Sequence, residues 1–188
     1  MDAFDAIAAR VSTRSFTPDP VPRATLARLL EAAVRAPNHK LTEPWRFAVL
    51  TGGAAVRYAE LRRDHRATRF PDPTAPDAAK AIEKTFREAR ETPAFVVVMC
   101  ATSDDPVRAE EDYAATMMAT ENLLIAAAAA GLGSYVRTGG IMGDPAVRAL
   151  AQAPESHRIV AVISLGRPAE PTPPRRRADA ASRTVWLD

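Results

Sequence analysis

Apolar residues recur with the spacing of an α-helix along much of the chain. Near the start, Phe4, Ile7 and Val11 share one face, which predicts a short helix over residues 2–10. Similar stripes and capping signals predict further helices at residues 26–34, 54–65, 78–90, 110–130 and 145–150. Each stripe needs a surface to cover it, so these helices are expected to pack on a common core.

Short apolar runs between the helices predict strands at residues 45–50, 94–101, 134–137 and 159–165. The run at 94–101 is continuous and rich in valine, which is typical of a strand buried on both faces. Alternating strands and helices predict a mixed α/β fold, of the α+β kind. Neither an internal repeat nor a linker is visible, so a single domain is predicted over residues 1–188.

The longest predicted helix, at residues 110–130, is apolar on two adjacent stripes. Tyr113 and Leu124 mark one stripe, and Met118 and Ile125 mark the other. Apolar surface on two sides indicates a central helix, or one that packs on a partner subunit. The three acidic residues at its start are interpreted as its first turn, where the helix dipole favours negative charge.

Composition narrows the class of protein. Of the 188 residues, 47% are hydrophobic and 26% are charged, which excludes wholesale disorder. Cys100 is the single cysteine, which excludes an internal disulfide and a multi-cysteine zinc site. The longest apolar run, at residues 123–132, is about half as long as a membrane span needs, and the first residues do not resemble a secretory leader. These features predict a cytoplasmic protein with a reduced, buried thiol.

Arginine dominates the positive charge, although the formal net charge is only +2. Lysine occurs only at Lys40, Lys80 and Lys84. Genomic composition bias is the simplest explanation of this preference. Arginine is also the better residue for bidentate recognition of phosphate, so the arginine clusters are candidate ligand sites.

Two arginine clusters are candidates for binding an anion. Arg10, Ser12 and Arg14 have a spacing of two, which places their side chains on one face of an extended segment. Two guanidinium groups beside a hydroxyl suit a phosphate, and a solvated helix end is the alternative. The second cluster, at residues 175–177, fits phosphate binding, weak nucleic-acid affinity or a solvated tail. No aromatic interleaving supports a nucleic-acid role.

Two loops carry the other candidate groups. Arg35 and His39 lie between a predicted helix and a predicted strand, where His39 could donate a proton, donate a hydrogen bond or only face solvent. The glycines at residues 131–140 follow a helix, whereas a dinucleotide fingerprint joins a strand to a helix, so a Rossmann site is rejected. Phosphate-loop, nucleophile-elbow and metal-ligand spacings are also missing from the sequence, so a cofactor is expected to carry any catalysis.

Five motifs in one order resemble the FMN-dependent nitroreductase family, and within it the compact YdjA-type branch of NAD(P)H nitroreductases. Residues 10–14 (RVSTR) and 35–47 (RAPNHKLTEPWRF) carry the first two motifs. The others are ENLL at residues 121–124, GLG at 131–133 and ISLGRP at 163–168. Together the motifs cover essentially the whole chain.

The resemblance implies a three-layer α-β-α sandwich with a mixed sheet, in a homodimer that has two FMN sites at its interface. The C-terminal arms of the two subunits would exchange, and Val185, Trp186 and Leu187 fit such an arm. NAD(P)H is the implied electron donor, and it would stack directly on the flavin. The preference for NADH or NADPH therefore stays open, and no metal, nucleic acid or membrane is expected as a partner.

The resemblance also implies which residues contact FMN. Arg10, Val11 and Ser12 are expected at its phosphate and ribityl end. Arg14 is expected near N1 and the C2 carbonyl of the ring, where a cation stabilises the reduced flavin. Arg35 matches a further cofactor-contacting position.

His39 matches another such position and is expected to reach the flavin across the subunit interface. Backbone groups near N5 of the flavin are expected from Val136, Arg137 and Thr138. Arginines of the tail would complete the phosphate site, with Arg175 and Arg177 preferred and Arg167 and Arg176 as alternatives.

The implied activity is ping-pong transfer of reducing equivalents from NAD(P)H, through flavin N5, to a nitroaromatic, quinone or similar small acceptor. The alternatives are an oxidase, dehalogenase or flavin-consuming enzyme on the same scaffold, and a flavin-binding protein without turnover. Leu41 and Glu43 stand where commoner family members carry Asn and Gln, which indicates a different substrate.

Overall fold

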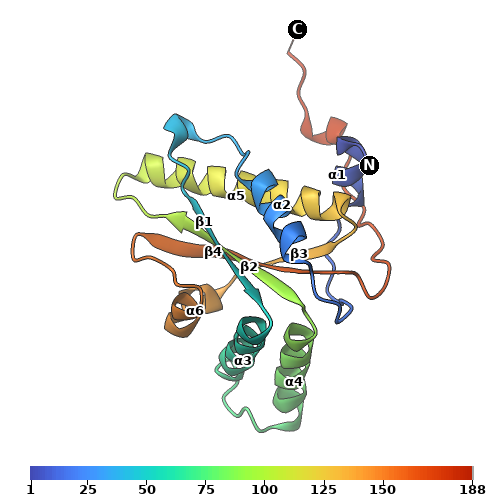
Figure 1. Cartoon of the computed structure of the whole chain (residues 1–188), viewed down its shortest axis with the longest axis vertical. Coiled ribbons are helices and arrows are strands. Elements are labelled where there is room, and N and C mark those ends of the chain that lie inside the picture. The colour runs from blue at the N-terminus through green and yellow to red at the C-terminus, as the bar shows by residue number, and fades with distance from the viewer. Residues whose placement is uncertain (188) are drawn as a thin grey trace.

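The computed structural model describes residues 1–187, which form helices on both faces of one sheet (Figure 1). The four strands are β1 (Trp45–Thr51), β2 (Ala94–Ala101), β3 (Gly133–Arg137) and β4 (His157–Gly166). Their order across the sheet is β1-β2-β4-β3, so β1 and β3 are its edges. Strand β2 is buried along residues 94–100, as its continuous apolar run predicted.

The sheet is antiparallel in all three ladders, where a mixed sheet was expected. Parallel pairing within the described residues is limited to an isolated bridge between Ser12 and Ser134. The connection after β1 explains the difference. Two successive helices return the chain to the end of the sheet that it left, so Thr51 at the end of β1 pairs with Ala94 at the start of β2. The fold is thus an α+β sandwich.

Helices form the two outer layers of the predicted sandwich. On one face lie α1 (Ala3–Ala9), α2 (Arg23–Ala33) and α5 (Pro106–Ala129), and on the other lie α3 (Gly53–Ala67), α4 (Pro76–Arg90) and α6 (Pro145–Leu150) (Figure 1). The short 3-10 turns are η1 (His39–Leu41), η2 (Gly140–Gly143) and η3 (Ala180–Arg183). None of the described helices has the length and apolar character needed to cross a bilayer.

Helix α5 begins one turn earlier than predicted. The side chain of Asp105 caps it by accepting a 3.0 Å hydrogen bond from the backbone N–H of Val107, and Pro106 occupies the first helical position. The acidic residues at 110–112 therefore lie in the second turn, not the first. One of them, Asp112, is buried and accepts a 2.7 Å hydrogen bond from Thr42, which ties the loop before β1 to this helix.

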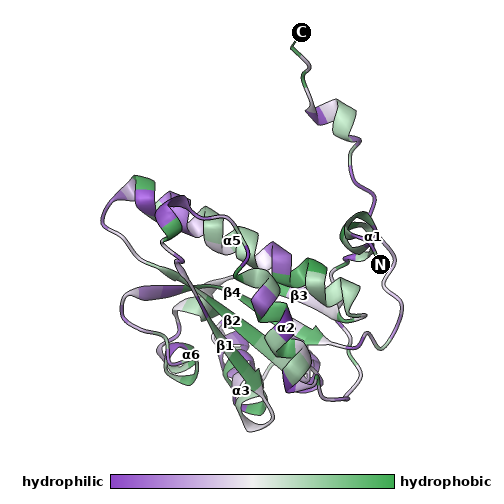
Figure 2. Cartoon of the chain, turned by 45° about the horizontal axis from the view of Figure 1, so that its top comes forward, coloured by the Kyte–Doolittle hydropathy of each residue, from purple (hydrophilic) through white to green (hydrophobic). Residues whose placement is uncertain are grey.

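The C-terminal segment leaves the folded body after β4. Figures 1 and 2 show the stretch that follows η3 standing away from the rest of the chain. At its end the side chains of Val185, Trp186 and Leu187 are 81%, 83% and 91% exposed. Three consecutive apolar side chains are thus exposed to solvent in the single chain.

Candidate functional site

The segment from Arg10 to Arg14 runs beside the edge strand β3. Ser12 forms a bridge with Ser134, and the backbone N–H of Thr13 donates to the Ser134 carbonyl at 2.9 Å. Thr13 is buried, while Ser12 and Arg14 on either side of it are exposed. The alternation of an extended segment therefore presents Ser12 and Arg14 to solvent, as their spacing predicted.

Gly133 allows this close pairing. A Cβ at this position would lie 2.7 Å from the side chain of Thr13. We expect Gly133→Ala to lower the free energy of unfolding by about 1–3 kcal/mol, because Thr13 is enclosed and has little room to move. Urea denaturation measures the change, with Gly53→Ala as the control because nothing lies within 4 Å of a Cβ there. Equal losses in the two variants would contradict the close approach.

A cavity of about 710 Å³ opens beside this segment. Three parts of the chain that are far apart in sequence line it, namely α1 with residues 10–15, Glu121 of α5, and the tail at residues 170–177. Four arginines belong to the lining: Arg10, Arg14, Arg175 and Arg177. The fold thus brings the two arginine clusters together. The other two arginines considered from the tail, Arg167 and Arg176, are not part of the described lining.

The charge of this cavity, which we call the arginine cavity, is only partly compensated. Nε of Arg10 lies 3.2 Å from Oε1 of Glu121, whose side chain is half exposed. Exposed ion pairs of this kind are weak, so an anionic ligand can replace the carboxylate. Glu170 is the other acid in the lining. Four guanidinium groups against two carboxylates leave the cavity electropositive.

Tyr135 connects the arginine cavity to the end of β3, and the sequence analysis missed it. Nη2 of Arg14 donates to its hydroxyl at 3.1 Å, and the guanidinium of Arg14 lies 5.1 Å from the ring centroid. The guanidinium of Arg137 lies 4.6 Å from the same centroid. Two cations thus hold one aromatic ring. Tyr135 and Arg137 are two residues apart on β3, so the sequence could have indicated that their side chains share one face of the strand.

Arg137 carries an unused hydrogen-bond donor. Its Nε donates to the hydroxyl of Ser164 at 3.2 Å, whereas its Nη2 is buried and has no partner. Burial lowers the pKa of Arg137, and the nearby positive charge of Arg62 adds to this effect. A buried donor without an acceptor is unfavourable, so this guanidinium fits a ligand that brings a carbonyl or an anionic oxygen.

The other predicted residues, Arg35, His39 and residues 136–138, do not line the arginine cavity. Nδ1 of His39 lies 3.1 Å from Oε1 of Glu111, and both side chains are exposed. Glu111 precedes Glu121 by ten residues of α5, about 15 Å along the helix axis. A single chain therefore does not bring His39 to the arginines.

The loop that carries His39 has an unusual backbone. Lys40, Leu41 and Glu43 have φ angles of 52°, 52° and 44°, a region that residues other than glycine rarely adopt. Such strain persists only when the surroundings enforce it, and it gathers at ligand sites and contacts. Leu41 is also 81% exposed, so this loop presents an apolar tip outward.

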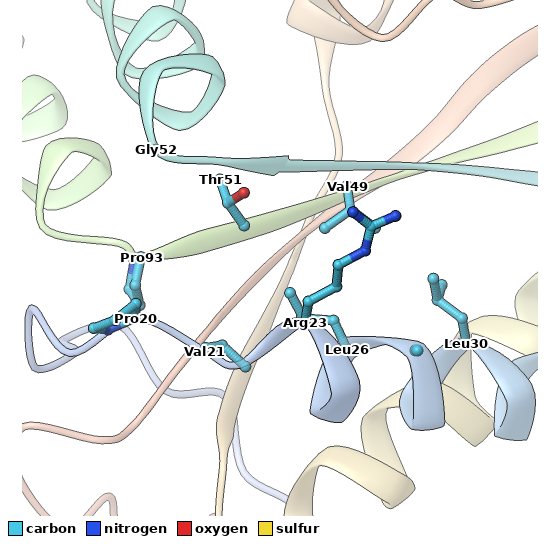
Figure 3. Close-up of a pocket in the computed structure, with 10 residues that line it drawn as sticks. Pro20, Val21, Arg23, Leu26, Leu30, Val49, Thr51, Gly52 and Pro93 are labelled. Carbon is cyan, nitrogen blue, oxygen red and sulfur yellow. The ribbon is translucent and has the colours of Figure 1, made fainter.

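A second cavity, of about 670 Å³, lies between α2 and the open edge of β1. Figure 3 shows Leu26 and Leu30 on the helix side, facing Val49 and Thr51 on the strand side. Strand β1 pairs only with β2 among the described residues, so its outer backbone groups are free. An apolar groove beside an unpaired edge suits an extended segment with apolar side chains.

The described residues contain no cluster of three or more His, Cys, Asp or Glu side chains that could hold a metal ion.

The sequence model of the Nitroreductase family matches residues 7–167 of the chain. The chain is 30% identical, over 180 residues, to "Putative NAD(P)H nitroreductase YfhC" of Bacillus subtilis, a match that covers 95% of this chain and 91% of that protein.

Solved structures show the same architecture. A nitroreductase-like family protein from Bacillus cereus superposes with a TM-score of 0.82 at 26% identity, over 100% of this chain and 97% of that one. The FMN and NADPH-dependent nitroreductase NfnB from "sphigopyxis sp. strain HMH" superposes with a TM-score of 0.79 at 23% identity, over 100% of both chains. This second likeness shows the fold alone. The match of the family model along most of the sequence shows that the chain belongs to the nitroreductase family.

Proposed function

We propose that the chain transfers reducing equivalents from NAD(P)H to a nitroaromatic, quinone or similar small acceptor in a ping-pong cycle, with FMN held in the arginine cavity. As a nitroreductase, the chain is an NAD(P)H-dependent flavin oxidoreductase. The proposal adds the cycle, the acceptor class and the place of the cofactor. FMN, when bound, supplies the redox centre that takes a hydride at N5 and passes reducing equivalents on. One observation supports the proposed position of the cofactor: the Arg10–Arg14 segment and the tail arginines Arg175 and Arg177 line the same cavity.

The residues present fit FMN at both of its ends. A phosphate needs cationic and hydroxyl donors, and Arg10, Ser12, Arg175 and Arg177 supply them around the arginine cavity. The ring of a flavin carries carbonyl oxygens, and the unpaired Nη2 of Arg137 is a donor for such a group. A cavity of about 710 Å³ is also of the size that cofactor sites have.

The chain's own groups then have separate tasks. The arginines around the phosphate would fix the position of the cofactor, and the backbone of Val136, Arg137 and Thr138 would flank its ring. Arg14, held by the hydroxyl of Tyr135, would supply a fixed positive charge to the reduced ring. No side chain of this set needs to move a proton in the first half of the cycle.

Replacing Arg14 with alanine tests this electrostatic task. We expect the fold to stay intact and either FMN affinity or the rate of flavin reduction by NADPH to fall about tenfold, because a charge-assisted interaction is lost. Stopped-flow absorbance measures the reduction rate, and fluorescence titration measures the affinity. Arg14→Lys retains the charge and is expected to recover part of the loss, whereas Arg28→Ala, at an exposed position of α2, is the neutral control. If neither quantity changes in Arg14→Ala, Arg14 does not belong to the site.

We also propose that the active unit is a homodimer in which each subunit completes the other's site. Apolar side chains on α1 and α5 support this proposal, because Phe4, Ile7 and Met118 are 83%, 54% and 43% exposed. His39 and Arg35 do not line the arginine cavity of their own chain, and a partner subunit would bring His39 to it. The cavity at the edge of β1 is the proposed seat of the partner's C-terminal arm (Figure 3).

The alternative activities give different products. An oxidase or a flavin-consuming enzyme needs dioxygen, so its NADPH oxidation or flavin loss would disappear under anaerobic conditions. A nitroreductase-type reaction continues without air as long as an acceptor such as nitrobenzene is supplied. A flavin-binding protein without turnover would bind FMN and leave NADPH unoxidised with every acceptor.

A further inference from the structure

A third cavity, of about 340 Å³, lies between α3 and the turn that follows β3. Helix α3 contributes Arg62, His65 and Arg66, the turn after α3 contributes Arg69, and the turn after β3 contributes residues 138–141. His65 and Arg66 follow Arg62 at spacings of three and four, so the three residues share one face of α3. Helix α3 and the turn after it thus direct three guanidinium groups and an imidazole toward the turn after β3.

The positive charge of this cavity has no internal counterpart. No Asp or Glu belongs to its described lining, and Arg62, Arg66 and Arg69 form no ion pair within the part of the chain that the structure describes. The other two arginines of α3 behave differently. Arg57 and Arg63 each pair with an acidic residue of the same helix at 2.8 Å. The unpaired arginines are therefore those that face the cavity.

One buried donor of the cavity lining also has no partner. Nη1 of Arg62 is buried and makes no hydrogen bond within the described residues. The hydroxyl of Tyr58, four residues earlier on α3, is likewise buried and unpaired. Burial raises the pKa of Tyr58, and the charges of Arg62 and Arg137 oppose that rise.

Glu88 is shared between two cations. Its charge raises the pKa of Arg137, and its Oε1 lies 4.0 Å from Nζ of Lys84. The positive charge of Arg62 lowers the pKa of Arg137. An anion in the cavity would offset the charge of the lining arginines and accept hydrogen bonds from them.

We propose that this cavity is a second anion site, distinct from the arginine cavity, and that it binds the phosphate or carboxylate group of a reactant. Its role in the reaction rests on the proposed function, whereas anion binding does not. Thr138 lines this cavity and is also one of the residues proposed to flank the ring of the cofactor. The bound anion would therefore belong to a molecule that lies beside the ring. That molecule is either the donor, through the phosphates of NADPH, or an anionic acceptor.

Direct binding is tested with inorganic phosphate on the FMN-loaded protein. His65 lines the cavity, so its ring signals in a proton–nitrogen NMR spectrum report on this site alone. We expect these signals to shift saturably with phosphate, while those of His157 stay in place. The double variant Arg66→Gln/Arg69→Gln is expected to need at least tenfold more phosphate. Arg57→Gln, on the same helix but paired with Glu60, is the matched control and is expected to behave as the parent.

Steady-state kinetics then separate the two sources of the anion. If the donor supplies it, the double variant raises KM for NADPH about tenfold and leaves KM for the acceptors unchanged. If the acceptor supplies it, KM rises for 4-nitrobenzoate and not for nitrobenzene. KM values that are all unchanged would overturn the assignment to a reactant.

Two further results would overturn the second site itself. One is that the His65 signals do not shift with phosphate, or that they shift at the same phosphate concentrations in the double variant as in the parent. The other is a loss of FMN affinity in the double variant, which would place these arginines in the cofactor site. Because the NMR titration does not depend on turnover, it still decides the question if the proposed oxidoreductase activity fails.

Discussion

The double variant Arg10→Ala/Arg175→Ala is expected to bind FMN at least about a hundredfold more weakly than the parent. The two arginines come from opposite ends of the sequence and meet in the arginine cavity. A charge-assisted hydrogen bond contributes about 1.5–3 kcal/mol, and about 1.4 kcal/mol corresponds to a tenfold change in affinity. Quenching of FMN fluorescence during a titration measures the dissociation constant.

Two controls separate this effect from a general loss of charge or stability. Arg176→Ala removes a tail arginine that is not part of the described lining, and it is expected to leave FMN affinity unchanged. Glu121→Gln removes the acid that faces Arg10 and is expected to retain or improve the affinity, because the guanidinium becomes free for phosphate. Equal affinities for the double variant and the parent would contradict the position of the phosphate.

Replacing Val185, Trp186 and Leu187 together with serine is expected to weaken the homodimer at least about a hundredfold. These side chains are exposed in the single chain and are proposed to occupy the partner's cavity beside β1. Burial of a large apolar side chain contributes about 3 kcal/mol, so the loss of Trp186 alone accounts for roughly this change. Sedimentation velocity over a range of concentrations measures the dissociation.

The serine variant retains the length and backbone of the arm, so it tests the apolar contacts and not the presence of the segment. Val49→Asp at the open edge of β1 is the complementary change, because it places a charge in the proposed seat of the arm. We expect the same shift toward monomer. A variant arm that leaves the dimer and the FMN affinity unchanged would contradict the exchange of arms.

Local pattern predicted the elements of this fold well. The valine-rich run at 94–101 became the buried β2, and the spacing of Arg10, Ser12 and Arg14 became an extended segment with Ser12 and Arg14 exposed. Both results depend on neighbours in sequence. The start of α5 was predicted one turn too far along the chain. The true N-cap, Asp105, precedes the acidic residues that the prediction placed in the first turn.

Features that depend on the path of the chain could not be predicted in the same way. Nothing local indicates that the tail returns to Arg10, because this stretch has no regular structure and its position follows from the end of β4. Arg62 has no distinguishing sequence signal either. Its place in the lining of the third cavity arises from the packing of α3 against the sheet. The feature that draws attention to Arg62 as a ligand group is its buried Nη1, which has no partner within the described residues.

The most direct test of the central claim, that the chain is an FMN-dependent oxidoreductase, is the visible spectrum of the purified protein. It is recorded as isolated, after addition of FMN, and then during anaerobic titration with NADPH and NADH. The account predicts flavin absorption bands that accompany the protein and that bleach when a reduced nicotinamide is added. A protein that shows no bands and binds no added FMN, or whose bands persist with both donors, would contradict the account.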